Sequence, residues 1–213
     1  MSGGGPAFAE DPSTQRYYDQ RAGEYDEWYL GEGLFAERDR PGWHEELQRL
    51  ERLLEALEPG TTLDVACGTA FLSRHLPGGV LGLDRSPAMV SIARGRLGRA
   101  AVADALALPV AAGSVTRVFT AHFYGHLPPE ERARFLAEVR QVAVELVVVD
   151  TATRPGCPAE MVQERVLNDG SRHRVFKRFL SAGQLADEIG GSALFDGRWF
   201  VAAQTRFDGV PRR

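Results

Sequence analysis

Three aspartates at the ends of short apolar runs are the first candidates for ligand binding. Asp64 lies in the segment Leu63-Asp64-Val65-Ala66-Cys67-Gly68-Thr69-Ala70, Asp84 ends the next apolar run, and Asp104 ends the third. In parallel α/β sheets, ligands bind outside the carboxyl ends of the strands. Asp84 lies twenty positions beyond Asp64, which is the spacing at which an acid reaches ribose hydroxyls. The acids therefore favour a ligand that contains a ribose.

The loop that follows the first run is built from small residues. Ala66, Gly68 and Ala70 permit a sharp turn and let a ligand approach the backbone closely. Alanine at position 70 requires a negative φ there, and a helix start after the loop would supply free N–H groups. A dinucleotide fingerprint needs more glycines than Gly68 alone. No Gly-Lys-Ser/Thr of a Walker A loop occurs, so nicotinamide and nucleoside triphosphate binding are disfavoured.

The segment after the fourth apolar run carries three candidate general bases, His122, Tyr124 and His126. A histidine has a reference pKa near 6.5 and can accept a proton from a hydroxyl. No cysteine or carboxylate lies at metal-ligand spacing from either histidine, so no metal site is expected. A structural role for His126, in which its ring bonds to the backbone, is the competing interpretation.

The elements that must position these residues alternate between strands and helices. Strands are predicted at 62–66, 80–84, 101–104, 115–120 and 144–150, and helices at 13–29, 43–57, 70–75, 87–97 and 130–142. Such alternation indicates βαβ units and a parallel sheet. After residue 150, alternation at 172–180, a short helix at 181–190 and a last strand within 193–204 predict an antiparallel closing edge.

Length and composition favour one globular domain. We expect tails at 1–11 and 207–213 and a single domain at 12–206, in which 12–57 form a helical lid. The net charge of −4 and the interspersed signs disfavour a nucleic-acid partner. Two cysteines, no signal peptide and no apolar run of roughly 18 residues predict a cytoplasmic protein without membrane insertion. The Ala, Gly and Arg usage is typical of bacteria with GC-rich genomes.

Taken together, the motifs of residues 15–150 resemble those of class I S-adenosylmethionine-dependent methyltransferases, of the small-molecule UbiE-like type found in ubiquinone and menaquinone biosynthesis. The segment Asp64–Ala70 is similar to the first motif of that family. The resemblance implies a Rossmann-like α/β fold with helices on both faces of a seven-stranded, mostly parallel sheet of order 3-2-1-4-5-7-6, in which strand 7 is antiparallel. It also implies S-adenosylmethionine as cofactor and S-adenosylhomocysteine as product.

The resemblance also implies binding roles. Asp84 would bind the ribose hydroxyls, Met89 would pack under the adenine, Asp104 would accept from its amino group, and Ala105 would donate to its ring. The aromatic N-terminal segment would reach the methionine carboxylate. The cofactor-binding positions implied in this way are Tyr17, Arg21, Tyr25, Asp64, Ala66, Gly68, Ala70, Asp84, Arg85, Met89, Asp104, Ala105, Thr120 and Ala121. His126-Leu127-Pro128 matches the loop that lines the methyl group.

We expect a small-molecule acceptor, attacked at O, N or C, and a monomer or homodimer. Three alternatives stay open: a non-methylation reaction on the same cofactor, a non-catalytic partner subunit, and a nicotinamide oxidoreductase. Basic residues near the expected acceptor pocket hint at an acidic or phenolic acceptor, but a solvated charge run is the simpler interpretation. They are His44, Arg172, His173, Arg174, Lys177 and Arg178.

Overall fold

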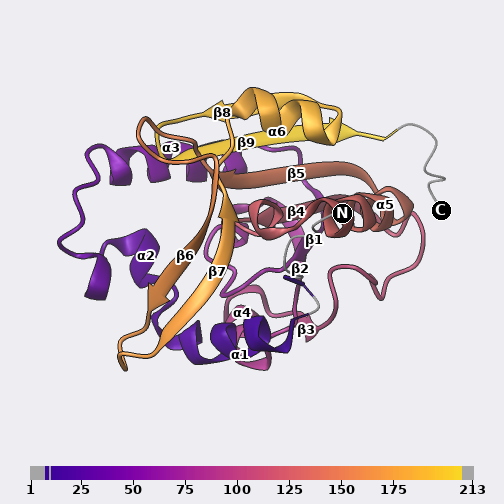
Figure 1. The fold of residues 1–213 in the computed structure, drawn as a ribbon. Coiled ribbons are helices and arrows are strands. Elements are labelled where there is room, and N and C mark those ends of the chain that lie inside the picture. The colour runs from indigo at the N-terminus through magenta and orange to yellow at the C-terminus, as the bar shows by residue number, and fades with distance from the viewer. Residues whose placement is uncertain (1–7, 10, 208–213) are drawn as a thin grey trace, which may run out of the picture.

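The computed structural model describes residues 8, 9 and 11–207, and a seven-stranded sheet forms its centre (Figure 1). The strands are β1 (Gly60–Val65), β2 (Gly78–Asp84), β3 (Ala100–Val102), β4 (Val115–Ala121), β5 (Ala143–Thr151), β8 (Ser192–Asp196) and β9 (Phe200–Arg206). Their order is β3-β2-β1-β4-β5-β9-β8, and β9 runs antiparallel to β5 and β8. Counted within this sheet alone, the order is the predicted 3-2-1-4-5-7-6, so the fold prediction is confirmed.

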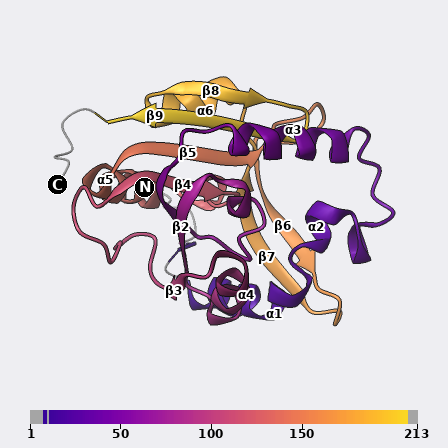
Figure 2. The same ribbon diagram turned by 180° about the vertical axis from the view of Figure 1, so that it is seen from behind.

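Helices cover both faces of the sheet. They are α1 (Pro12–Arg21), α2 (Glu27–Leu30), α3 (Trp43–Glu55), α4 (Pro87–Leu97), α5 (Pro129–Val142) and α6 (Ala182–Ile189). Helices α5 and α6 lie on the face turned to the viewer in Figure 1, and α3 lies on the face seen in Figure 2. Alternate side chains of β5 serve the two cores, because successive residues of a strand point to opposite faces. Leu146 and Val148 pack with α5, and Val147 and Val149 pack with α3.

Helix α4 begins where the sequence predicts it, because its start carries two local signals. Ser86 is the N-cap and its hydroxyl accepts from the backbone N–H of Met89, while Pro87 occupies the first turn. Gly98 ends the helix in the left-handed region. Helix α4 therefore sits directly after β2, with its N-terminus at the carboxyl edge of the sheet.

The predicted helix at 13–29 is interrupted, which corrects the sequence prediction. α1 ends at Arg21, the 3-10 helix Ala22–Glu24 follows, and α2 begins at Glu27. Asp26 precedes α2 without capping it, because its carboxylate accepts from the Thr69 hydroxyl at 2.6 Å and pairs with Arg96. These contacts hold the chain against the loop after β1, so it cannot continue as one straight helix.

The predicted helix at 70–75 is also wrong. Ala70 has φ of 60°, in the left-handed region, and not the negative φ that alanine was expected to keep. A residue in that conformation cannot continue a right-handed helix. The chain turns sharply instead, and only the 3-10 helix Ser73–His75 forms.

The closing region differs from the prediction as well. The segment 172–180 does not pair with the last strand: β7 (Arg172–Arg178) pairs antiparallel with β6 (Glu160–Val166) in a separate two-stranded sheet. The antiparallel edge of the main sheet is formed by two strands, β8 and β9, where a single strand was predicted within 193–204. In Figures 1 and 2 the β6–β7 hairpin runs from the sheet toward α1 and α2.

Part of the predicted N-terminal tail is packed. Phe8 and Ala9 are buried, and their backbone N–H groups donate to the Glu131 carboxylate at 2.9–3.2 Å. The other residues of that tail, 1–7 and 10, and the residues 208–213 of the C-terminal tail lie outside the described residues. Within the described ranges, no helix is long and apolar enough to cross a membrane.

A buried glutamate of α3 joins that helix to the start of β9. The Glu46 carboxylate accepts from the backbone N–H groups of Arg198, Trp199 and Phe200 at 2.9, 2.7 and 2.8 Å. Three charge-assisted bonds at one carboxylate fix the turn between β8 and β9 against α3.

We therefore predict that Glu46→Ala lowers the free energy of unfolding by about 2–4 kcal/mol, because buried N–H groups lose their acceptor. The exposed neighbour variant Glu45→Ala should change it by less than about 0.5 kcal/mol. Urea titrations of the two variants and the wild type measure this difference. Equal midpoints for both variants would contradict the assigned role of Glu46.

Candidate active site

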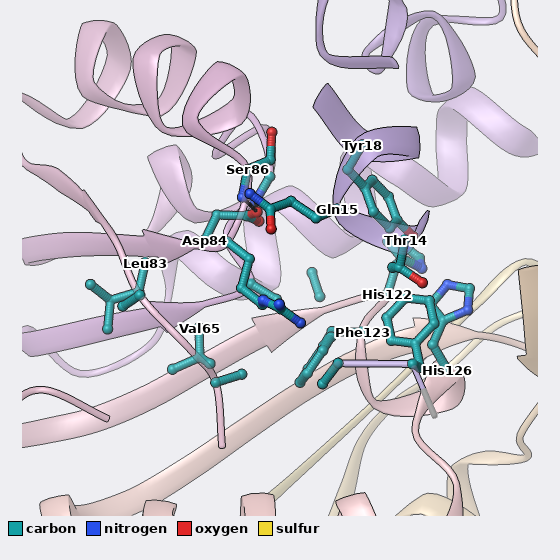
Figure 3. Close-up of a pocket in the computed structure, with 18 of the residues that line it drawn as sticks. Thr14, Gln15, Tyr18, Val65, Leu83, Asp84, Ser86, His122, Phe123 and His126 are labelled. Atoms are coloured by element: carbon teal, nitrogen blue, oxygen red, sulfur yellow. Dashed lines mark hydrogen bonds between the residues drawn. The ribbon is translucent and has the colours of Figure 1, made fainter. Parts of the chain in front are cut away.

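A cavity opens at the carboxyl ends of β1, β2, β3 and β4 (Figure 3). Its empty volume is about 690 Å³, part of which is open solvent. It lies where β1 and β4 are neighbours and the strand order reverses, the usual ligand position in such sheets. The lining comprises Phe8, Ala9, Thr14, Gln15, Tyr18, Tyr25, Val65, Ala66, Gly68, Leu83, Asp84, Arg85, Ser86, Ala103, Ala105, Ala121, His122, Phe123 and His126.

Asp84, at the end of β2, bridges two loops of the cavity wall. Its Oδ2 accepts from the backbone N–H of Gly68 and its Oδ1 from that of Ser86, both at 2.9 Å. Burial raises the pKa of Asp84, and these two N–H groups act in the opposite direction. The carboxylate thereby fixes the loop after β1 while it faces the cavity (Figure 3).

The loop after β1 leaves its backbone open to the cavity because its side chains are small and its turns are tight. Ala66 and Gly68 have φ of 56° and 52°, both in the left-handed region. A Cβ on Gly68 would lie 3.5 Å from the Tyr25 ring, which covers the glycine from the lid side. The flat ring and the small loop residues bound a narrow part of the cavity.

Asp64 lies behind this loop and does not line the cavity. Its side chain is buried, and its Oδ1 has no hydrogen-bond partner among the described residues. Burial raises the pKa of the Asp64 carboxyl to about 8, and the nearby negative charge of Asp84 adds to the effect. The carboxyl is therefore largely protonated near neutral pH.

The lid is tied to the cavity wall by polar contacts. Asp19 of α1 accepts from the Ser86 hydroxyl, and Asp26 holds Thr69 and Arg96. Thr14, Gln15 and Tyr18, on the α1 side of the cavity, form its upper boundary in Figure 3. The lid and the strand ends therefore enclose one space.

His122 follows β4 in a strained conformation and faces the cavity. Its φ is 56°, which is uncommon for a residue with a side chain and typical of functional sites. Its Nδ1 lies 3.3 Å from Thr151 Oγ1 and 3.9 Å from Asp150 Oδ1. Nε2 is buried without a hydrogen-bond partner among the described residues. Burial lowers the pKa of His122 to about 3, against the opposing pull of Asp150, so the ring is neutral.

His126 lies at the same end of the cavity and is fixed on two sides. Its Nδ1 donates to the carbonyl oxygen of Phe176 at 2.5 Å, which leaves Nε2 as the basic nitrogen. The Phe8 ring stacks on the imidazole with a centroid distance of 4.6 Å. Burial holds the pKa of His126 well below its ordinary value.

Asp150, at the end of β5, organises the residues behind His122. Its carboxylate accepts from the backbone N–H groups of Gly125 and Thr151, both at 2.7 Å, and pairs with Lys177 of β7. Burial acts to raise the pKa of Asp150, but Lys177 and His122 outweigh it and hold it below the ordinary value. Lys177 is buried, so the solvated charge run predicted for 172–178 is wrong at this residue.

The structure brings nine of the sequence-predicted site residues to the cavity. They are Tyr25, Ala66, Gly68, Asp84, Arg85, Ala105, Ala121, His122 and His126. The others lie outside its lining: Tyr17, Arg21, Asp64, Ala70, Met89, Asp104, Thr120 and Tyr124.

Two of the residues outside the lining have evident structural roles. The Thr120 hydroxyl donates to the Val65 carbonyl at 2.7 Å and ties β4 to β1. Tyr124 is buried and its ring packs near that of Phe135, with a centroid distance of 6.5 Å.

Several cavity residues were not identified from the sequence. Ser86 was recognised only as a helix cap, although it also lines the cavity. Asp150 carried a usable signal, because it is an acid at the carboxyl end of a predicted strand, as Asp84 is. Thr14, Gln15 and Phe123 carried no signal that separates them from ordinary polar or core residues.

Comparison with known proteins adds the class of the chain. A family model described as "Methyltransferase domain" matches residues 62–145. The matched residues include most of β1, all of β2, β3 and β4 and the start of β5, and with them the strand ends that form the cavity. None of the curated proteins matches the sequence significantly.

Solved structures with the same fold include methyltransferases. A DhpI complex with SAM and HEP is 26% identical, with a TM-score of 0.69, over 92% of this chain and 96% of that chain. A DhpI–SAH complex is 24% identical, with a TM-score of 0.67, over 95% and 98% of the two chains. The glycopeptide N-methyltransferase MtfA with sinefungin is 17% identical, with a TM-score of 0.55, over 75% and 91%. The chain has the Rossmann-like fold of S-adenosylmethionine-dependent methyltransferases.

The buried carboxyl of Asp64 generates a pH prediction. Its pKa is raised in the folded protein, so the folded state keeps a proton that the unfolded chain releases above its ordinary pKa near 4. The contribution of the Asp64 carboxyl to the free energy of unfolding is therefore largest at low pH, and it decreases as pH rises from about 4 to about 8. Asp64→Asn removes this dependence, so its stability relative to the wild type should increase across that window by at most about 1.4 kcal/mol per pH unit.

Urea midpoints of wild type and Asp64→Asn at several pH values between 4 and 9 test this. His122 and the other titrating groups are present in both proteins, so their effects on the free energy of unfolding cancel when the two proteins are compared at each pH. A difference that stays constant with pH would refute the raised pKa.

Proposed function

We propose that this methyltransferase binds S-adenosylmethionine in the cavity and methylates an O, N or C atom of a small molecule, releasing S-adenosylhomocysteine. One observation carries the proposal: a single cavity has the Asp84 carboxylate at one end and two neutral histidines at the other (Figure 3). The first end suits a ribose, and the second suits a reaction that releases a proton.

The cavity residues fit the cofactor. Asp84 keeps acceptor capacity for ribose hydroxyls in addition to the two backbone N–H groups that it already binds. Ala66, Ala103 and Ala105 leave room for a flat ring system beside the strand ends. Arg21, whose guanidinium lies 4.9 Å from the Tyr25 ring centroid, is the proposed partner of the methionine carboxylate.

Direct displacement requires the protein to align two reactants and remove a proton. When bound, the cofactor supplies a methyl group activated by the sulfonium. The acceptor would take this methyl group and lose its proton to the protein, and S-adenosylhomocysteine would remain. We assign His122 as the base that takes the acceptor proton at Nε2, because its Nδ1 is held toward Thr151 and Asp150. The Asp150 carboxylate stabilises the imidazolium that forms.

His126 is the second candidate for this role, since its Nε2 is unprotonated. The Phe176 carbonyl at its Nδ1 is a neutral acceptor, whereas His122 has a carboxylate at 3.9 Å. We therefore place His126 in a positioning role and leave Tyr124 out of the mechanism.

A small acceptor is supported by the contact between the lid and the tip of the β6–β7 hairpin. The Asn168 backbone N–H donates to Glu24 at 2.8 Å, and the Asn168 side chain donates to Glu27 at 3.0 Å. These bonds join the hairpin tip to the lid, so the acceptor must fit beneath both. The UbiE-like subtype stays a prediction.

We predict that Asp84→Ala weakens binding of S-adenosylhomocysteine at least about tenfold, or ~1.4 kcal/mol, in titration calorimetry. The wild type should bind with a micromolar Kd. Asp196→Ala, at an exposed acid of β8, is the matched control and should bind like the wild type. If folded wild-type protein shows no binding, the proposed function is wrong.

We further predict that His122→Asn lowers kcat about 10²–10⁴-fold, while the Kd for S-adenosylhomocysteine changes by less than threefold, about 0.7 kcal/mol. The acceptor for this assay is identified by transfer of a labelled methyl group to a fractionated metabolite mixture. Transfer of the label also separates methylation from other reactions on the same cofactor. An unchanged kcat in His122→Asn would remove this residue from the mechanism.

A further inference from the structure

Two arginines converge on one hydroxyl beside the cavity. Arg21 of α1 donates from Nη1 to Tyr17 Oη at 2.5 Å, and Arg165 of β6 places its Nη1 3.5 Å from the same oxygen. Arg165 Nη2 also donates to Gln163 Oε1 at 3.3 Å. Like charges brought together in a partly buried place repel each other, and a neutral hydroxyl does not offset that repulsion.

No carboxylate in the described part of the chain lies within 4 Å of either guanidinium. Other arginines do have such partners: Arg96 pairs with Asp26, and Arg117 pairs with Glu145. The alternation along β6 turns Gln163 and Arg165 toward the lid, while the alternate residues Val162, Glu164 and Val166 are exposed. A partly exposed cation on this inner side is available to a ligand.

A third positive group lies near this pair. Arg38 follows the 3-10 helix Gly33–Phe35, and its guanidinium stacks on the Phe35 ring at 4.5 Å. Burial lowers the pKa of Arg38, and the positive charges of Arg21 and Arg165 lower it further. All three guanidiniums therefore share one electrostatic environment at the edge of the lid.

The charge of Arg165 also reaches the catalytic end of the cavity. Burial is the main cause of the low pKa values of His122 and His126, and the positive charge of Arg165 is among the smaller causes that lower both. That charge acts in the same direction on the hydroxyls of Tyr18 and Tyr25, which line the cavity. In geometry, Arg165 contacts the lid through Tyr17, whose ring centroid lies 6.0 Å from its guanidinium carbon.

The charge balance of the proposed complex is positive without another anion. The cofactor has one carboxylate, one ammonium and one sulfonium group, so it brings one net positive charge. In the proposed function its carboxylate is taken by Arg21. Arg165 then adds a further positive charge beside the cavity, with a hydroxyl and an amide oxygen but no carboxylate of the described residues within 4 Å of it, which costs free energy where solvent is partly excluded.

We infer that the methyl acceptor carries an oxyanion, a carboxylate or a phosphoryl group, and that Arg165 binds it beside Tyr17. This inference rests on the proposed function, because it concerns the second reactant of the same cavity. Arg165 has the donor geometry for two oxygens of one anion, and Arg38 adds charge at the rim. Arg165 is thus the specificity-determining residue, and the acceptor's nucleophilic atom points toward His122.

The test uses the full chain saturated with S-adenosylhomocysteine and two probes, inorganic phosphate and acetate, titrated at constant ionic strength. Chemical-shift changes in NMR spectra report weak binding. We expect saturable binding of at least one probe to the wild type. Arg165→Gln should weaken it at least about tenfold, and Arg165→Lys should weaken it less because the charge remains. Tighter binding of phosphate indicates a phosphoryl acceptor, and tighter binding of acetate indicates a carboxylate.

Arg172→Gln is the matched control, because Arg172 lies on the neighbouring strand, is exposed and pairs with Glu164. It should bind the probes like the wild type. Two outcomes overturn the inference. The first is that neither probe binds saturably to the wild type loaded with S-adenosylhomocysteine. The second is that the Arg165 and Arg172 variants bind the probes equally weakly. If Arg165→Gln weakens S-adenosylhomocysteine as much as the probes, Arg165 serves the cofactor and the inference also fails. Failure of the wild type to bind S-adenosylhomocysteine would instead refute the proposed function.

Discussion

The active-site end of this fold depends on one buried carboxylate that is bound by backbone. Asp84 accepts from Gly68 and Ser86, and so connects the loop after β1 with the start of α4. The loop can take this path only because it enters the left-handed region at Ala66, Gly68 and Ala70. Alanine in that region costs about 1–2 kcal/mol per residue. The bonds to Asp84 and the surrounding core offset this cost, which keeps the cavity wall in one arrangement.

Two other carboxylates of the site are also fixed by hydrogen bonds and ion pairs. Asp26 holds Thr69 and Arg96 from the lid, and Asp150 holds Lys177 from the hairpin. Each carboxylate therefore joins an element outside the main sheet to a strand end or to the loop that follows it. His122 and His126 lie between these anchors and stay neutral through burial. Burial therefore keeps both basic nitrogens free of protons near neutral pH.

The sequence was sufficient for the features that depend on periodicity. Helices α4 and α5 follow from apolar runs and, for α4, from its cap, and they were predicted correctly. The order of the main sheet was also predicted correctly, but it came from the family resemblance and not from periodicity. The errors occur where a tertiary contact overrides local preference. Asp26 leaves its helix to bind Thr69, and Ala70 takes a conformation that ends the predicted helix. Strand β6 was missed because its apolar residues are the exposed ones, the reverse of the usual pattern.

The candidate site shows the same division. Asp84, Gly68 and the two histidines were found because they follow strands, and the sheet topology brings strand ends together. Arg165 and Lys177 could not be found in this way, because a charged residue in an alternating strand has the same sequence pattern whether it faces water or the interior. Lys177 is buried because Asp150 neutralises it. Arg165 has no such partner among the described residues, and an inward-facing cation without a counter-ion is most simply explained by an anionic ligand.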